Sequence, residues 1–267
     1  MGTTYIYNAD SWDEFLSDLK TNAILPAWES DAGSLSGSES FSQSKSWEHS
    51  LDMAERGWHE GREALHAAMF KTVTDRMPEF DLAPAGFMPC IPAYAIGIPE
   101  DMFCPSEFAQ EVPKPIVRIV VNITASGCVE AEHLANRGAA IVQLIDRIQL
   151  AGQRVELVAV FGSDHRSKGQ KTLCTITVKR PEEPVDLDRI SYAIAHPAML
   201  RRSLFRVMEF TVPHRVSGYG VPMDSSEFYG ERDIYIKSMM SDSSGFESRE
   251  QAVKTVNKIW EKAAQAA

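Results

Sequence analysis

The pattern of hydrophobic and polar positions is clearest near the middle of the chain. Residues 116–123 (IVRIVVNI) form a continuous β-branched run, typical of a parallel strand that is covered on both faces. Apolar positions then recur at helical spacing through residues 129–150, and Gly152 ends this pattern. A second apolar run, residues 154–161, follows it. Strand, helix and strand in this order predict a right-handed βαβ unit.

The pattern continues in the same style toward the C-terminus. Residues 171–180 alternate and predict an antiparallel partner or an edge strand. Residues 186–210 predict a helix interrupted at Pro197, and residues 232–240 predict a further strand. Ser248 opens a final amphipathic helix. The fold class expected from these elements is α/β, with a doubly wound and mostly parallel sheet.

The first part of the chain has a different character. A short strand is predicted at residues 4–8, and Ser11 and Ser46 each cap the first turn of a helix. The serine-rich residues 30–46 predict a mobile linker or a long loop. Residues 78–115 combine many prolines with large apolar side chains, which predicts extended chain packed on a neighbouring unit. The expected division is a helical, serine-rich and proline-rich segment over 1–112, followed by an α/β domain over 113–267.

The composition is that of a chain that can fold without cross-links such as disulfides or bound metals. A chain of 267 residues can bury a substantial core. It contains no run of about 18 apolar residues, and its start lacks the basic and apolar regions of a secretory signal. The four cysteines include no CxxC pair, which argues against a zinc site built on cysteine. We expect a cytoplasmic protein with no membrane association, no metal and no cofactor.

Charge is distributed unevenly along the chain. The net charge is −10, which argues against indiscriminate nucleic-acid binding. Residues 113–215 nevertheless carry +5, and the rest of the chain carries −15. The middle of the chain could therefore offer a basic surface, although a core domain often varies by this much.

The turn after the first long strand carries side chains that could bind a ligand. Asn122, Thr124 and Ser126 alternate there. The order of elements over 116–264 resembles the von Willebrand factor A fold, whose first strand ends in Asp-x-Ser-x-Ser at a metal-ion-dependent adhesion site. The three residues stand where that pattern would be, and Asp242 aligns with a second acidic ligand of the family. The resemblance implies a domain that binds a protein partner through this turn.

Asn122 departs from the pattern of that family. It keeps an oxygen but loses the charge, and Mg²⁺ is held weakly by neutral ligands. We therefore expect a degenerate site without a metal. The alternative is that Thr124 or Ser126 only hydrogen-bonds the first turn of the next helix.

A second resemblance concerns possible origin and partners. The segments SWEHSLDMAERGWHEG, RIVVNITASGCVEAEHLANRGAAIVQLIDRIQLAG and AHPAMLRRSLFR are similar to a family of phage and mobile-element proteins. Acidic phage proteins of this size include a cofactor that binds single-stranded DNA and recruits a phage-encoded RNA polymerase. This resemblance implies single-stranded DNA and a polymerase as partners, in the host cytoplasm.

The basic side chains provide the candidate DNA surface. They lie on a turn and on a helix, where they could neutralise phosphates while Phe205, Tyr219 and Tyr229 stack on unpaired bases. The alternative is a solvated helix face that pairs with acidic residues such as Glu209. The candidate residues are Arg166, Lys168, Lys171, Arg201, Arg202, Arg206 and Arg215.

No group of residues predicts catalysis. His59, Glu63 and His66 do not have the spacing of the zinc-protease motif HExxH, and a solvated helix face explains them. Ser163 and His165 are near neighbours in sequence, whereas a catalytic triad converges from separate segments. No phosphate-binding glycine motif is present. The expected function is a non-enzymatic phage accessory protein that binds single-stranded DNA; the alternative is an interaction module that acts through residues 122–126.

Overall fold

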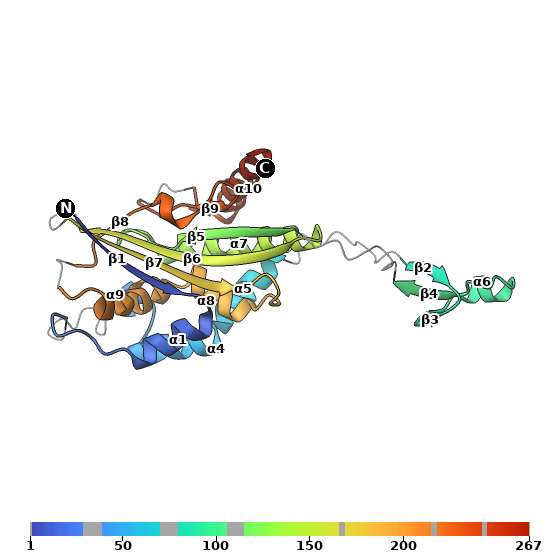
Figure 1. The fold of residues 1–267 in the computed structure, drawn as a ribbon, viewed down its shortest axis with the longest axis horizontal. Helices are drawn as coiled ribbons and strands as arrows, with labels where there is room; N and C mark the ends of the chain where they lie inside the picture. The colour runs from blue at the N-terminus through green and yellow to red at the C-terminus, as the bar shows by residue number, and fades with distance from the viewer. Residues whose placement is uncertain are drawn as a thin grey trace. The chain divides into compact units, whose positions relative to one another are not determined.

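The computed structural model describes residues 2–28, 39–69, 80–105, 115–165, 169–214, 218–241 and 245–266. It divides into two compact units (Figure 1). The main unit comprises Met1–Lys71 and Ile116–Ala267, and the small unit comprises Thr72–Pro115. This division differs from the expected boundary at 112/113, because the N-terminal residues belong to the α/β unit.

The main unit is built on one mixed sheet in the order β1-β7-β6-β5-β9. The pairs β1/β7, β5/β6 and β5/β9 are parallel, and β6/β7 is antiparallel. The short β8 pairs with β6. This confirms an α/β fold with a mostly parallel central sheet. The strands are β1 (Thr3–Ala9), β5 (Ile116–Asn122), β6 (Arg154–His165), β7 (Gln170–Lys179), β8 (Val221–Pro222) and β9 (Ile234–Ile236).

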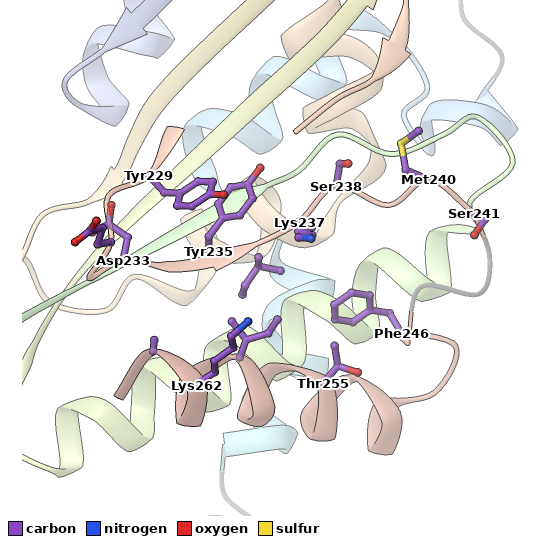
Figure 2. A pocket seen from close by; sticks show the side chains of 14 residues that line it. Tyr229, Asp233, Tyr235, Lys237, Ser238, Met240, Ser241, Phe246, Thr255 and Lys262 are labelled. Carbon is purple, nitrogen blue, oxygen red and sulfur yellow. The ribbon is translucent and has the colours of Figure 1, made fainter. Parts of the chain in front are cut away.

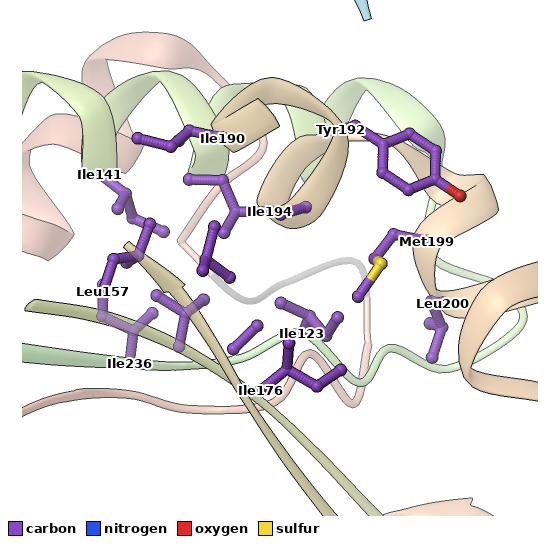
Figure 3. Close-up of a cluster of buried hydrophobic side chains, with 14 of the residues drawn as sticks. Ile123, Ile141, Leu157, Ile176, Ile190, Tyr192, Ile194, Met199, Leu200 and Ile236 are labelled. Atoms are coloured by element: carbon purple, nitrogen blue, oxygen red, sulfur yellow. The ribbon is translucent and has the colours of Figure 1, made fainter. Parts of the chain in front are cut away.

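Helices of the main unit share one large hydrophobic cluster (Figure 3). Alternate strand residues, such as Ile119 and Val121, contribute to this cluster from the sheet. The helices are α1 (Trp12–Thr21), α3 (Glu39–Ser42), α4 (Trp47–Arg56), α5 (His59–Met69), α7 (Ala131–Leu150), α8 (Leu187–Ala195), a π-helical segment (Met199–Leu204), α9 (Phe205–Thr211) and α10 (Arg249–Ala266).

The opposite face of the sheet is covered differently. Val120 and Val160 belong to a second, smaller cluster that is closed by Phe228, from the 3₁₀ turn Ser226–Phe228. In the part of the chain that the structure describes, no α-helix joins this second cluster. The expected doubly wound arrangement is therefore corrected, because among the described residues the α-helices that cover the sheet contribute to the large cluster on one face and none contributes to the cluster on the other face.

The N-terminal segment is part of the same core. All seven residues of β1 pair with β7. Phe15 and Leu19 of α1 are buried in the large cluster. The Trp12 indole donates to the carbonyl of Ala54 at 2.9 Å, which joins α1 to α4. These contacts explain why residues 1–69 fold with the α/β unit.

The proline-rich segment forms a unit of its own. Its strands pair antiparallel in the order β2-β4-β3, and they are accompanied by a short helix. The expected irregular extended chain is therefore corrected, because these residues pair with one another. The elements are β2 (Phe80–Ala83), β3 (Met88–Pro89), α6 (Ile91–Ala95) and β4 (Met102–Pro105).

No helix among the described residues is long and apolar enough to cross a bilayer.

Candidate binding site at the carboxyl end of the sheet

Asn122 ends β5 with its side chain buried inside the protein. Its Nδ2 lies within hydrogen-bond distance of Met223 O (2.9 Å), Asp224 Oδ1 (3.0 Å) and the Tyr235 hydroxyl (3.1 Å). Its Oδ1 accepts from the Thr124 N–H at 3.1 Å. All these partners belong to the protein, so the Asn122 side chain is fully used internally.

Asp224 explains why residue 122 is an amide. Its carboxylate accepts from the Tyr235 hydroxyl at 2.6 Å and from the N–H and hydroxyl of Ser238. Burial raises the pKa of Asp224, but hydrogen bonds from Tyr235, Ser238 and Asn122 outweigh this effect, and the pKa is lowered. An aspartate at 122 would place a second carboxylate against this ionised group.

The turn after Asn122 is hydrogen-bonded to β6 and to the segment that follows β9. The Thr124 hydroxyl accepts from the Gly162 N–H at 3.0 Å. The Ser126 N–H donates to Met239 O, and the Met239 N–H donates to Thr124 O. Neither hydroxyl caps α7, whose N-cap Glu130 makes no side-chain capping bond. The helix-capping alternative is therefore corrected, because the Thr124 hydroxyl bonds β6 and the Ser126 hydroxyl accepts from the Cys128 thiol, which precedes α7.

A pocket of about 390 Å³ lies beside this turn. Thr124, Ser126 and Gly127 form part of its wall, and Arg201 is the charged side chain among the described residues that line it. No Asp or Glu is among the described residues that line it. The rest of the lining is mainly aromatic and apolar, and includes Phe41, Phe161, Phe205 and Tyr219.

Arg201 is buried, with 5% of its surface exposed. Its guanidinium donates to the carbonyls of Val129 (2.9 Å) and Phe41, and lies over the Phe41 ring. Among the described residues, its Nε has no hydrogen-bond partner and its guanidinium pairs with no carboxylate. Burial lowers the pKa of Arg201, yet an arginine stays protonated at neutral pH. The pocket therefore carries a cation that no carboxylate of the described residues neutralises.

The other arginines of this helix also bind the protein itself. Arg202 is 2% exposed and donates to the Ser42 hydroxyl and the Ser44 carbonyl, both at 3.2 Å. Arg206 donates to the carbonyl of Asn22. The expected basic helix surface is corrected here, because these cations hold N-terminal segments against the core. Ser42 and Ser44 are likewise buried, rather than part of a mobile serine-rich linker.

The other predicted residues differ in their relation to this pocket: Phe205 and Tyr219 line it, whereas Lys171 and Tyr229 are not among its lining residues. Lys171 is exposed on β7. Phe205 and Tyr219 stack on each other with 3.6 Å between ring centroids, and Trp28 stacks on the Tyr219 ring. Tyr229 stacks on Tyr235. Arg166, Lys168, Arg215 and Asp242 lie outside the described residues.

The residues weighed for catalysis are also engaged internally. The Ser163 hydroxyl donates to the carbonyl of Tyr219. The Nε2 atom of His165 lies 3.4 Å from the Ser163 Oγ. The Nδ1 atom of His59 lies 2.9 Å from the Oδ1 atom of Asp188. Within the described part of the chain, no group of three His, Cys, Asp or Glu side chains could hold a metal ion.

Sequence reasoning missed a second hollow, a groove of about 590 Å³ between the segment 229–241 and α10 (Figure 2). Thr255, Ile259 and Ala263 of α10 line it. Their spacing of four residues places them on one helix face. This stripe was visible in the sequence, but its pairing with β9 was not.

Comparison with known proteins identifies one family. Residues 2–263 match the model described as "Domain of unknown function (DUF7192)". No curated protein and no solved structure matches the chain.

Proposed function

We propose a binding function for this chain, which belongs to the DUF7192 family of domains of unknown function. The pocket beside residues 124–127 receives a carboxylate of a protein partner, and Arg201 supplies the attracting charge. No metal and no catalytic step are involved. The protein is then a non-enzymatic interaction module.

The uncompensated charge of Arg201 carries this proposal. Burying a cation away from water is unfavourable unless hydrogen bonds and an opposite charge offset it. Two backbone carbonyls meet part of this need, while no described residue bonds the Nε. A bound carboxylate would supply the missing negative charge. The hydroxyls of Thr124 and Ser126 line the same pocket and add polar contacts.

The resemblance to the von Willebrand factor A fold fits this proposal. In that family the turn after the first strand binds partners through a metal ion. Here the strand, helix, strand and antiparallel strand follow in the order β5, α7, β6 and β7. The Asn122 side-chain amide is hydrogen-bonded to the Asp224 carboxylate. In the proposed site the buried Arg201, rather than a metal, provides the positive charge at this end of the sheet.

Single-stranded DNA binding, with recruitment of a phage RNA polymerase, is the competing hypothesis. This hypothesis requires a basic surface on the helix. Arg201 and Arg202 are buried, so they do not supply that surface. Lys171 remains exposed, and the other turn residues are not described. Binding of single-stranded DNA is therefore the alternative outcome of the experiment below.

The test follows the arginine side-chain Nε–H signals of the ¹⁵N-labelled full chain by NMR. The Arg201 signal is the one that disappears in Arg201→Lys. We expect it to shift saturably when acetate replaces chloride at constant ionic strength, together with the amide signals of residues 124–127. An acidic peptide, Ac-GEEG-NH₂, should shift the same signals at lower concentration.

The control is Arg147→Lys, at a partly buried arginine that donates to Asn257 outside this pocket. It should leave the acetate response unchanged. Equal shifts with acetate and chloride would overturn the proposal. A saturable response to an oligo-dT strand, weakening with salt and absent with the peptide, would instead support the DNA hypothesis.

A further inference from the structure

The strand β9 (Ile234–Ile236) is the last strand of the main sheet, and among the described strands it pairs only with β5. A bridge between Ala125 and Met239 extends this parallel alignment beyond the strand. The segment from 234 to 239 therefore runs along the sheet with one edge unpaired by any described strand. Such an edge offers backbone N–H and C=O groups to another chain. Within this segment the Ser238 N–H already donates to Asp224 and Met239 bonds the turn at 124–126, so the edge open to another strand is that of β9 itself.

The groove of about 590 Å³ follows this edge. Figure 2 shows Tyr235, Lys237 and Ser238 along the strand segment, with Thr255 and Lys262 projecting from α10 opposite them. Thr255 and Lys262 share one face of α10, and this face lines the groove. The groove therefore has a sheet edge on one side and a helix on the other. Peptides that extend a sheet bind in grooves bounded in this way.

The interior of the groove is apolar. Ile236 and Phe246 are buried at its base, and Ile259 is partly buried on the α10 side. Met240 lines the groove with 51% of its surface exposed. An extended peptide directs alternate side chains to one face, so an aliphatic side chain could occupy this base while its neighbours remain in water.

The charges that line the groove favour an acidic peptide. Asp233 is already neutralised, because Arg118 lies 2.7 Å from it and the Gly230 N–H also donates to it. Lys237 and Lys262 are exposed and make no ion pair among the described residues. Among the described residues that line the groove, these two lysines outnumber the acid for which no ion pair is found, Glu231. A carboxylate on the peptide would therefore find a cation within the groove.

We propose that this groove binds an extended segment of a partner protein, which adds as a strand beside β9. An aliphatic side chain of that segment lies between β9 and α10, and an acidic side chain pairs with Lys237 or Lys262. This site is separate from the Arg201 pocket and does not depend on the function proposed for it. The partner is identified by chemistry: an extended peptide with aliphatic and acidic residues at neighbouring positions.

The first experiment uses a phage-displayed library of random dodecamer peptides, selected on the immobilised full chain. We expect enriched sequences that combine aliphatic and acidic residues. One enriched peptide, labelled with fluorescein, then gives a Kd by anisotropy. Selection without enrichment would overturn the proposal.

Backbone methylation tests the strand geometry. Each amide of the enriched peptide is N-methylated in turn. Loss of at least tenfold in affinity at alternate positions is expected, because only every second N–H of an added strand faces β9. Equal effects at all positions, or no effect at any, would overturn strand addition.

Charge reversal tests the location. The double variant Lys237→Glu, Lys262→Glu should weaken binding at least tenfold. Lys258→Glu makes the same change on an exposed position of α10 that does not line the groove, and should stay within twofold of the wild type. Equal binding by the wild type and the double variant would overturn the proposal. Arg201→Lys should bind this peptide normally, so a failure of either site is seen separately.

Discussion

The side-chain amide of Asn122 donates a hydrogen bond to the carboxylate of Asp224, with 3.0 Å between Nδ2 and Oδ1. The two residues are 102 positions apart in sequence. Tyr235 and Ser238 donate to the same carboxylate, so Asp224 is held ionised by several donors. Position 122 therefore needs a hydrogen-bond donor, which a metal-binding aspartate could not provide.

Asn122→Asp should lower the free energy of unfolding at pH 7.5 by about 2–4 kcal/mol, because it loses a buried donor and places two carboxylates together. Urea denaturation at pH 7.5 and pH 5 measures this. The loss should shrink at pH 5, where the pair can share a proton. The control Asn257→Asp places its carboxylate beside Arg147 and should be neutral or slightly stabilising. Wild-type stability of Asn122→Asp at pH 7.5 would contradict the assigned role.

His196 should make stability depend on pH between about 6.5 and 4. Burial, with a smaller effect of His49, lowers the pKa of His196 from 6.5 to about 4. The unfolded state then binds a proton at a higher pH than the folded state, so stability falls as pH drops through this window. The loss is about 3 kcal/mol at most, since one pKa unit corresponds to about 1.4 kcal/mol.

The measurement is urea denaturation at several pH values for the wild type and His196→Asn. The Nδ1 of His196 accepts from the Ala198 N–H at 3.0 Å, and the asparagine oxygen can take this role. The variant should show a flatter pH dependence across the window. Parallel curves for the two proteins would count against a buried neutral imidazole.

Arg202→Met should lower the free energy of unfolding by about 2–4 kcal/mol, because Ser42 and Ser44 lose a charged donor inside the protein. Lys171→Met, at an exposed position of β7, should change it by less than about 0.5 kcal/mol. Thermal and urea denaturation of both variants give the comparison. Equal, small effects would show that Arg202 is a surface residue after all.

A fragment of residues 113–267 should not fold by itself. Without β1 the edge of β7 is open, and without α1 and α4 the sheet face that contacts Phe15 and Met53 is exposed to water. Circular dichroism should show no cooperative unfolding transition for the fragment. Co-expression with residues 1–71 should restore one. A cooperative transition in the fragment alone would mean that the N-terminal segment is dispensable for the fold.

Local pattern was sufficient for much of the secondary structure. Continuous β-branched runs predicted β5 and β6, and the helical spacing between them predicted α7. The N-caps were also readable: the Ser11 hydroxyl accepts from the Glu14 N–H, and the Ser46 hydroxyl accepts from the His49 N–H. These features depend on residues within a few positions of one another, so the sequence by itself determined them.

Tertiary structure decided what the polar residues do. Arg201 and Arg202 look like surface cations in sequence. They are buried because the carbonyls of Phe41 and Ser44 and the hydroxyl of Ser42, about 160 positions away, accept hydrogen bonds from their guanidinium groups. In sequence, Asn122 resembles a metal ligand. In the structure its side-chain amide donates to Asp224, from a distant loop. The strand-like start of the chain became a sheet edge only by pairing with β7. Burial and hydrogen-bond partners are long-range properties, and a local pattern of polarity does not contain them.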